Sequence, residues 1–170
     1  EDGSPTLSAF ELDVSPSEEG SRLTVIHAAA APTVDVVLKR IWMTSWKVEG
    51  LSNGDSASLD LRGGLYFAKI YPAGSDEKVF GPAFLFLRNQ YSHVVYAFGS
   101  LAEGSFGLIT QKIHMEPPTP EAGMVSVVHG IPGLTVDVFV NGALTLDDFE
   151  PGTITDPLER PADDHHAGGP

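Results

Sequence analysis

The chain has 170 residues and no cysteine, and its 23 acidic and 10 basic side chains give a formal net charge of −13. The lack of thiols excludes disulfides, thiolate metal sites and cysteine nucleophiles, while the acidic charge disfavours binding to nucleic acid and to anionic membrane surfaces. The 42% of hydrophobic residues suffice for a core, and without a run of about 18 apolar residues we expect no membrane span.

Alternation of apolar and polar residues is the main local pattern, and it predicts short strands. One is expected near the start of the chain, at Thr6–Leu12, and others follow through residue 113: Arg22–His27, Thr33–Lys39, Ala57–Arg62, Leu65–Tyr71, Ala83–Leu87, His93–Phe98 and Phe106–Ile113. Turn residues such as Asn53-Gly54 separate them at intervals of roughly eight to twelve residues. We therefore predict an all-β chain whose residues 21–113 form a complete, immunoglobulin-like antiparallel β-sandwich.

A second, partial unit follows a proline-rich linker at residues 114–123, which is expected to be an extended spacer. Residues 124–162 are predicted to form the opening half of a sandwich, with Asn141-Gly142 as a hairpin turn and with strands at Met124–Gly130, Leu134–Asn141 and Ala143–Leu146. This unit stops where the complete one would enter its Leu65–Tyr71 strand.

The last residues, 163–170, show no pattern and are expected to form a flexible tail. They include Asp163-Asp164-His165-His166, whose side chains are of metal-ligand types. A preformed site needs fixed geometry, which a glycine-flanked tail lacks. Weak adventitious binding is therefore the expectation for the tail, and no resident metal is predicted.

The two units are copies of one repeat. Residues 24–37 return as residues 126–139, at an offset of 102, and residues 2–7 are echoed at 103–108, the end of the complete unit. The chain thus reads as the end of one unit, a complete unit and the start of another. Residues 1–16 could close the second unit within the chain, which tethering favours, or another chain could supply the missing strands.

These motifs resemble the secreted bacterial domain-of-unknown-function family 4397. The resemblance rests on the His-x-x-x-x-Pro-x-Val-Asp-Val pattern within Val25–Val37, on Val125–Val138, on Asp148–Leu158, and on Leu61–Tyr66 before the Tyr71–Gly74 turn. It implies an all-β sandwich, export to the cell wall, the cell surface or the periplasm, and no known reaction. The chain departs from the family in the order of its units and in the strands missing from its second copy.

Each copy of the repeat contains a histidine and an aspartate eight residues apart: His27 with Asp35, and His129 with Asp137. Such a pair can act as a base with its orienting partner, or can contribute to a metal site. Neither pair is accompanied by a nucleophile motif or by a third ligand in a fixed pattern. We expect both pairs to be structural, and we expect no catalytic residue and no cofactor.

The copies differ most between residues 39 and 47, where the second copy has a plain hairpin. This segment holds both tryptophans of the chain together with basic side chains. Tryptophan and arginine are enriched at binding hot spots, so Arg40, Trp42, Trp46 and Lys47 are candidate contact residues for a protein partner or a surface glycan. The alternative is that Trp42 or Trp46 fills the sandwich core.

The sequence therefore predicts an exported, non-catalytic β-sandwich module for cell-surface or protein–protein interaction, located outside the cell, in the wall or in the periplasm. The alternative is an extracytoplasmic accessory or structural subunit of a larger membrane complex. An enzyme is a third interpretation, for which the sequence supplies no constellation. Nucleic acid is not an expected partner, and self-association through incomplete sandwich edges is a further expectation.

Overall fold

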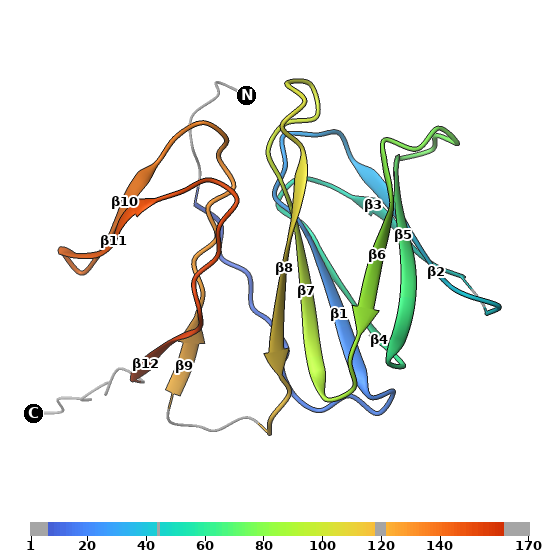
Figure 1. Cartoon of the computed structure of the whole chain (residues 1–170), viewed down its shortest axis with the longest axis horizontal. Helices are drawn as coiled ribbons and strands as arrows, with labels where there is room; N and C mark the ends of the chain where they lie inside the picture. The colour runs from blue at the N-terminus through green and yellow to red at the C-terminus, as the bar shows by residue number, and fades with distance from the viewer. Residues whose placement is uncertain (1–6, 44, 118–121, 162–170) are drawn as a thin grey trace, which may run out of the picture.

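The structure is a computed structural model that describes residues 7–43, 45–117 and 122–161. Every regular element in these ranges is a strand, which confirms the all-β prediction (Figure 1). The first eight strands are β1 (Ser21–His27), β2 (Val34–Arg40), β3 (Ser45–Leu51), β4 (Ser56–Leu61), β5 (Gly64–Pro72), β6 (Phe80–Leu87), β7 (Tyr91–Phe98) and β8 (Gly107–His114).

These strands form two four-stranded sheets, in the orders β4-β1-β7-β8 and β3-β2-β5-β6, which face each other as a sandwich (Figure 1). The first strand pairs antiparallel with β4 and parallel with β7. In an immunoglobulin constant domain the first strand instead neighbours the second in an antiparallel sheet. The β-sandwich is confirmed, whereas the immunoglobulin-like detail is not supported by this strand order.

The core of the sandwich is built by side chains that alternate along each strand. Val34, Val36 and Leu38 of β2 point inwards and are at most 5% exposed. Tyr66 on the neighbouring strand β5 and Leu23 on β1 of the facing sheet are equally buried. β3 is not among the predicted strands, because its polar residues alternate with a tryptophan and the segment was expected to be a contact loop. Its inward residues pack on the same core.

The segment before β1 differs from the prediction of a strand there. Residues 7–12 form no strand, although Thr6–Leu12 was expected to be one; Thr6 itself lies outside the described residues. Phe10 and Leu12 instead pack on the outer face of the β4-β1-β7-β8 sheet, against the cluster of Ile26, Val94, Tyr96 and Ile109. Apolar residues at every second position need only a surface to cover, and an extended segment lying across a sheet meets that need without strand pairing.

The second unit contains two strand pairs: β9 (Ala122–Val125) with β12 (Leu158–Pro161), and β10 (Val136–Val140) with β11 (Ala143–Phe149). The predicted strand at Met124–Gly130 is shorter than expected, and β12 is additional. The Asn141-Gly142 hairpin turn is confirmed, with φ angles of 52° and 81°, as a two-residue turn of the type I′ class requires.

The second unit lies on the outer face of the β4-β1-β7-β8 sheet, beside β8 (Figure 1). Its Val128 and Ile154 join the cluster that Phe10 and Leu12 also cover. A chain of hydrogen bonds crosses the contact: the Tyr96 hydroxyl donates to Gln111 Oε1 at 3.1 Å, and Gln111 Nε2 donates to Ser126 Oγ at 2.8 Å. Consequently both faces of β1 are buried.

Candidate functional site

His27 closes the loop that follows β1. Its Nδ1 accepts a hydrogen bond from the backbone N–H of Ala29 at 3.3 Å, and its Nε2 lies 3.2 Å from the carbonyl oxygen of Pro32. A ring that accepts at Nδ1 carries its proton on Nε2, so Nε2 donates to the carbonyl. The side chain is 1% exposed, and both of its nitrogens are engaged by the backbone.

His129 makes the same two bonds in the second unit. Its Nδ1 accepts from the N–H of Ile131 at 3.3 Å, and its Nε2 lies 2.6 Å from the carbonyl oxygen of Leu134. The ring also stacks on Phe149, with centroids 5.9 Å apart. The repeated histidine therefore holds the same loop in both copies.

The repeated aspartate holds a different piece of backbone. Asp35 Oδ1 accepts from the N–H of Gly50 at 2.9 Å, and Asp137 Oδ1 accepts from the N–H of Asp148 at 3.0 Å. Gly50 and Asp148 both have positive φ angles, 68° and 50°. Thus histidine and aspartate act at separate places, which favours the structural interpretation over a base-and-orienter pair.

The pKa of the Asp35 carboxyl is held below its ordinary value of 3.8, first by the hydrogen bond from the Gly50 N–H and then by Lys47. The Lys47 ammonium lies 3.1 Å from Asp35 Oδ2 and 2.7 Å from Glu49 Oε1. The pKa of Lys47 is correspondingly raised, mainly by its bond to Glu49 and then by its bond to Asp35. The side chain of Lys47, a predicted contact residue, is thus held by two carboxylates of the β2–β3 hairpin.

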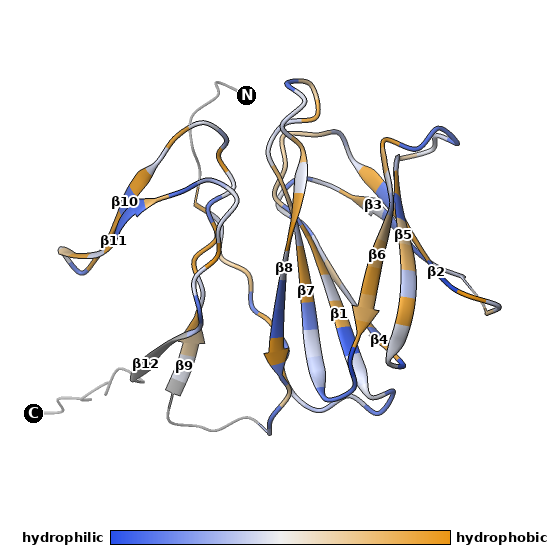
Figure 2. Cartoon of the chain, viewed as in Figure 1, coloured by the Kyte–Doolittle hydropathy of each residue, from blue (hydrophilic) through white to orange (hydrophobic). Residues whose placement is uncertain are grey.

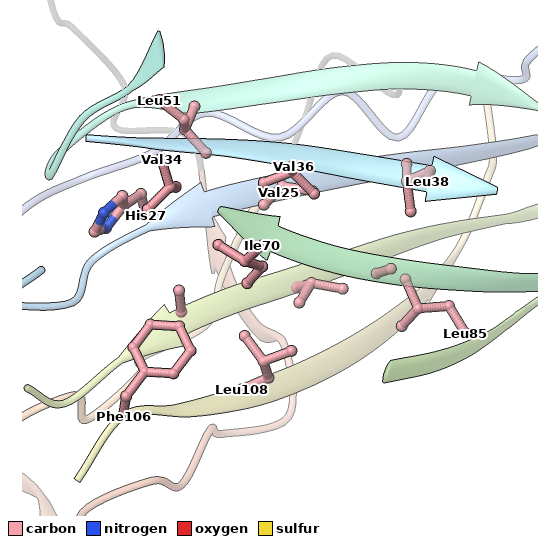
Figure 3. A pocket seen from close by; sticks show the side chains of 13 residues that line it. Val25, His27, Val34, Val36, Leu38, Leu51, Ile70, Leu85, Phe106 and Leu108 are labelled. Atoms are coloured by element: carbon pink, nitrogen blue, oxygen red, sulfur yellow. The ribbon is translucent and has the colours of Figure 1, made fainter. Parts of the chain in front are cut away.

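The sandwich interior contains a cavity of about 30 Å³, lined by apolar residues from both sheets, with His27 at one end (Figure 3). Ligand pockets are typically about 300–1,000 Å³. A void of about 30 Å³ is far below that range and is a gap in the packing between the sheets.

A shallow, open depression of about 530 Å³ lies among the loops at one end of the sandwich. Its lining is uncharged and consists mostly of small residues: Ala30, Ala31, Pro32, Asn53, Ser100, Leu101 and Ala102. These side chains offer a ligand neither charge nor deep apolar burial, so we do not take the depression as a site.

The hairpin tip, defined here as Ile41, Trp42 and Met43, is exposed. Trp42 is 98% exposed, Ile41 45% and Met43 53%, and the β2–β3 hairpin that carries them projects beyond the sheets (Figure 1). The Met43 N–H donates to the Arg40 carbonyl oxygen at 3.2 Å, which closes a four-residue turn. Trp42 is the third residue of that turn and has φ 60°, a conformation that favours glycine or asparagine.

The other two predicted contact residues, Arg40 and Trp46, support the hairpin from within. Trp46 packs on the core, with its ring centroid 5.7 Å from that of Tyr66. The Arg40 guanidinium lies 5.8 Å from the same tyrosine ring and donates to the Gly63 carbonyl oxygen at 3.1 Å. The structure therefore separates the two tryptophans: Trp46 packs on the core, and Trp42 is 98% exposed at the hairpin tip.

A second exposed apolar surface was not predicted. The β5–β6 aromatic face consists of Leu65, Phe67, Phe84 and Phe86 on the outside of the sandwich; Phe84 is 65% exposed and Phe86 is 70% exposed. Phe67 and Phe84 are cross-strand neighbours with ring centroids 5.0 Å apart, and Figure 2 shows β6 as an apolar strand. The signal was present: Ala83–Leu87 is apolar at every position, which is typical of a strand buried on both faces.

Three exposed carboxylates, those of Asp137, Asp147 and Asp148, lie with their oxygens within 4.8 Å of one another. Exposed acidic residues alone do not define a metal site. The predicted tail ligands at residues 163–166 lie outside the described residues.

Comparisons with family models, with curated proteins and with solved structures each found no match. Across the described part of the chain, none of the elements is a helix of the length and apolarity needed to cross a membrane.

Proposed function

We propose that the protein is an exported, non-catalytic β-sandwich module that contacts a protein partner or a surface glycan through the hairpin tip. The exposed Trp42 carries this proposal. A large aromatic side chain in a left-handed backbone conformation costs roughly 1 kcal/mol, and fully exposed it gains little from packing within its own chain. An observed outlier of this kind is a reason to look for function.

The surroundings of Trp42 fit a binding role. Ile41 and Met43 add exposed apolar surface on either side, while Arg40 and Trp46 fix the hairpin to Tyr66 below. A rigid aromatic anchor loses little conformational entropy on binding.

A non-catalytic role is supported by the bonds of the repeat residues. His27 and Asp35 satisfy backbone groups, and the interior cavity beside His27 is only about 30 Å³. Export to the wall, the surface or the periplasm is supported by the resemblance to family 4397, and membership of that family is part of the proposal.

A second candidate is an accessory subunit on the outer face of a membrane complex. The β5–β6 aromatic face favours it, because contiguous exposed aromatic residues are common in stable interfaces. Copurification with a complex solubilised from native membranes would favour the subunit; recovery as a free wall or periplasmic protein would favour the module.

The two tryptophans give a test with an internal control. We expect Trp42→Ala to reduce cosedimentation of the purified chain with isolated cell envelopes by about tenfold, which corresponds to roughly 1.4 kcal/mol. Its urea unfolding should stay within about 0.5 kcal/mol of the parent. Trp46→Ala should instead lower stability by roughly 2 kcal/mol or more, because it removes packing on Tyr66. Undiminished envelope binding by Trp42→Ala would refute the proposal.

A further inference from the structure

The strand β6 forms one edge of the β3-β2-β5-β6 sheet. Among the described residues it pairs with β5 alone, and Ala83–Leu87 make no hydrogen bond outside that pairing. Alternate N–H and C=O groups of an edge strand point away from its sheet, where another strand can pair with them. The sheet lies on the side of the sandwich away from the second unit (Figure 1), so the second unit does not cover this edge.

β6 lacks the charged side chains that the other edges of the sandwich carry. A charge on an edge strand opposes its pairing with another chain. The other three edge strands each have at least one: Lys47 and Glu49 in β3, Asp60 in β4, and Lys112 in β8. β6 has none along its length. Its one protective residue is Pro82, which has no N–H to donate, so the unprotected segment is Ala83–Leu87.

Both faces of this segment are apolar. Ala83, Leu85 and Leu87 point inwards and pack on the core. Phe84 and Phe86 lie on the outside and are 65% and 70% exposed. A strand that adds to this edge therefore needs apolar side chains on both of its faces. Exposed strands of that kind are avoided in soluble proteins because they promote aggregation, but a second copy of this chain supplies one.

Two copies of β6 fit together antiparallel about a two-fold axis. With Leu85 opposite the partner's Leu85, Ala83 lies opposite the partner's Leu87, and Phe84 lies opposite the partner's Phe86. Opposed side chains of an antiparallel pair lie on the same face, so phenylalanine meets phenylalanine outside and aliphatic residues meet inside. This register pairs the whole uncharged segment and leaves Pro82 at its end. A two-fold contact uses the same surface of both copies, so the association stops at a dimer.

Charge does not oppose this pairing, although the whole chain has a net charge of −13. Residues 21–113, which form the sandwich, hold nine basic and seven acidic side chains, so the surplus of acid lies outside them. Arg88, which follows the apolar segment, lies over the ring of Tyr91, with its guanidinium carbon 5.2 Å from the ring centroid. At physiological ionic strength, charges more than about 8 Å apart are largely screened.

We infer that two copies of the chain associate through antiparallel β6–β6 pairing, which joins their β3-β2-β5-β6 sheets into one continuous sheet. Main-chain hydrogen bonds supply affinity, and the alternate apolar side chains supply specificity. The β5–β6 aromatic faces of the two copies then lie side by side on the same side of the joined sheet. The contact is separate from the hairpin tip, and its test does not depend on the function proposed above.

Sedimentation equilibrium of the full chain tests the association. We expect a concentration-dependent dimer, which Phe86→Lys should weaken at least about tenfold because it places a charge on the edge. Phe86 is 70% exposed, so the change should leave urea unfolding of the monomer unaltered. Phe139→Lys is the matched control, since Phe139 is 61% exposed but lies on β10, and it should keep the dimer. A chain that stays monomeric throughout the micromolar range, or equal weakening by both substitutions, would overturn the inference.

Introduced cysteines can report the register, because the chain has none of its own. Opposed Cα atoms of an antiparallel pair are about 4.5–5.5 Å apart, within the range that a disulfide spans. A mixture of Phe84→Cys and Phe86→Cys chains should therefore crosslink under mild oxidation. Each variant alone should crosslink far less, since its two cysteines are displaced by about 7 Å along the strands. Equal yields from the mixture and from the separate variants, on a non-reducing gel, would contradict the two-fold pairing at Leu85.

Discussion

At the scale of single residues, the repeated histidine and aspartate show how a repeated pair of polar residues can serve the fold alone. In both copies each histidine nitrogen bonds a backbone group of the following loop. A buried loop must satisfy its N–H and C=O groups, and leaving one unpaired costs roughly 1–3 kcal/mol. The two copies keep the same loop length after the histidine, because each ring must reach the N–H two residues later and the carbonyl oxygen five residues later.

We therefore expect His27→Ala to destabilise the protein by roughly 2–4 kcal/mol, through two lost hydrogen bonds and a larger interior void. Urea unfolding followed by tryptophan fluorescence would measure it. His114→Ala is the matched control, because His114 is exposed and contacts Glu116 at the surface, and surface ion pairs contribute little. Equal effects of the two substitutions would contradict the structural role of His27.

At the scale of elements, the β2–β3 hairpin is fixed at its base and exposed at its tip. Asp35 bonds the Gly50 backbone and Lys47, Trp46 packs on the core, and the chain between them turns outward. These contacts keep the hairpin tip in one geometry, which a binding anchor requires.

The hairpin should respond to acid in a definite direction. Because the folded-state pKa of Asp35 lies below 3.8, its contribution to stability is complete above about that pH and is lost as pH falls through the folded value. Asp35→Asn should flatten this part of the acid limb in unfolding curves recorded between about pH 7 and pH 2.5. Asp35→Ala should flatten it too, with a larger loss at pH 7, since asparagine can still accept from Gly50. An unchanged acid limb in both variants would contradict the assignment.

Strand alternation was the most reliable signal in the sequence, and its failures have physical causes. It predicts the strands around Arg22–His27 and Leu65–Tyr71 because one or both faces of each strand are buried. It fails at Thr6–Leu12, because the apolar residues of this segment cover the outer face of a sheet without pairing as a strand. It also cannot tell that Trp42 is exposed whereas Trp46 packs on the core. Their difference depends on where the β2–β3 turn closes, and the segment contains no Asn-Gly or Gly-Gly pair to mark that point.

At the scale of the whole molecule, the two units differ in how much they bury. The complete sandwich has an interior core between its sheets. The second unit lies on the outside of that sandwich, where Val128 and Ile154 pack and where the Gln111–Ser126 bond and the bond from the Gly99 N–H to the Gly130 carbonyl oxygen join the two units. Regions with few buried apolar contacts open at lower free energy.

Hydrogen exchange should follow this division. We expect amides of β1 and β7 to be the slowest, and those of β10 and β11 to exchange at least about a hundredfold faster. Val128→Asp should speed exchange in the second unit further and leave β1 to β8 nearly unchanged. Met124→Asp, at a 61% exposed position, should alter neither. Uniform protection across both units would show that they unfold together.

The left-handed backbone at Trp42 has a consequence for any attempt to improve the protein. A glycine at this position would relieve the turn and loosen no core contact, so a search for thermostable variants would select it. The same change would remove the side chain that the hairpin presents. Stabilising the fold and keeping the proposed contact residue are therefore opposed at Trp42, as stability and activity commonly are at functional sites.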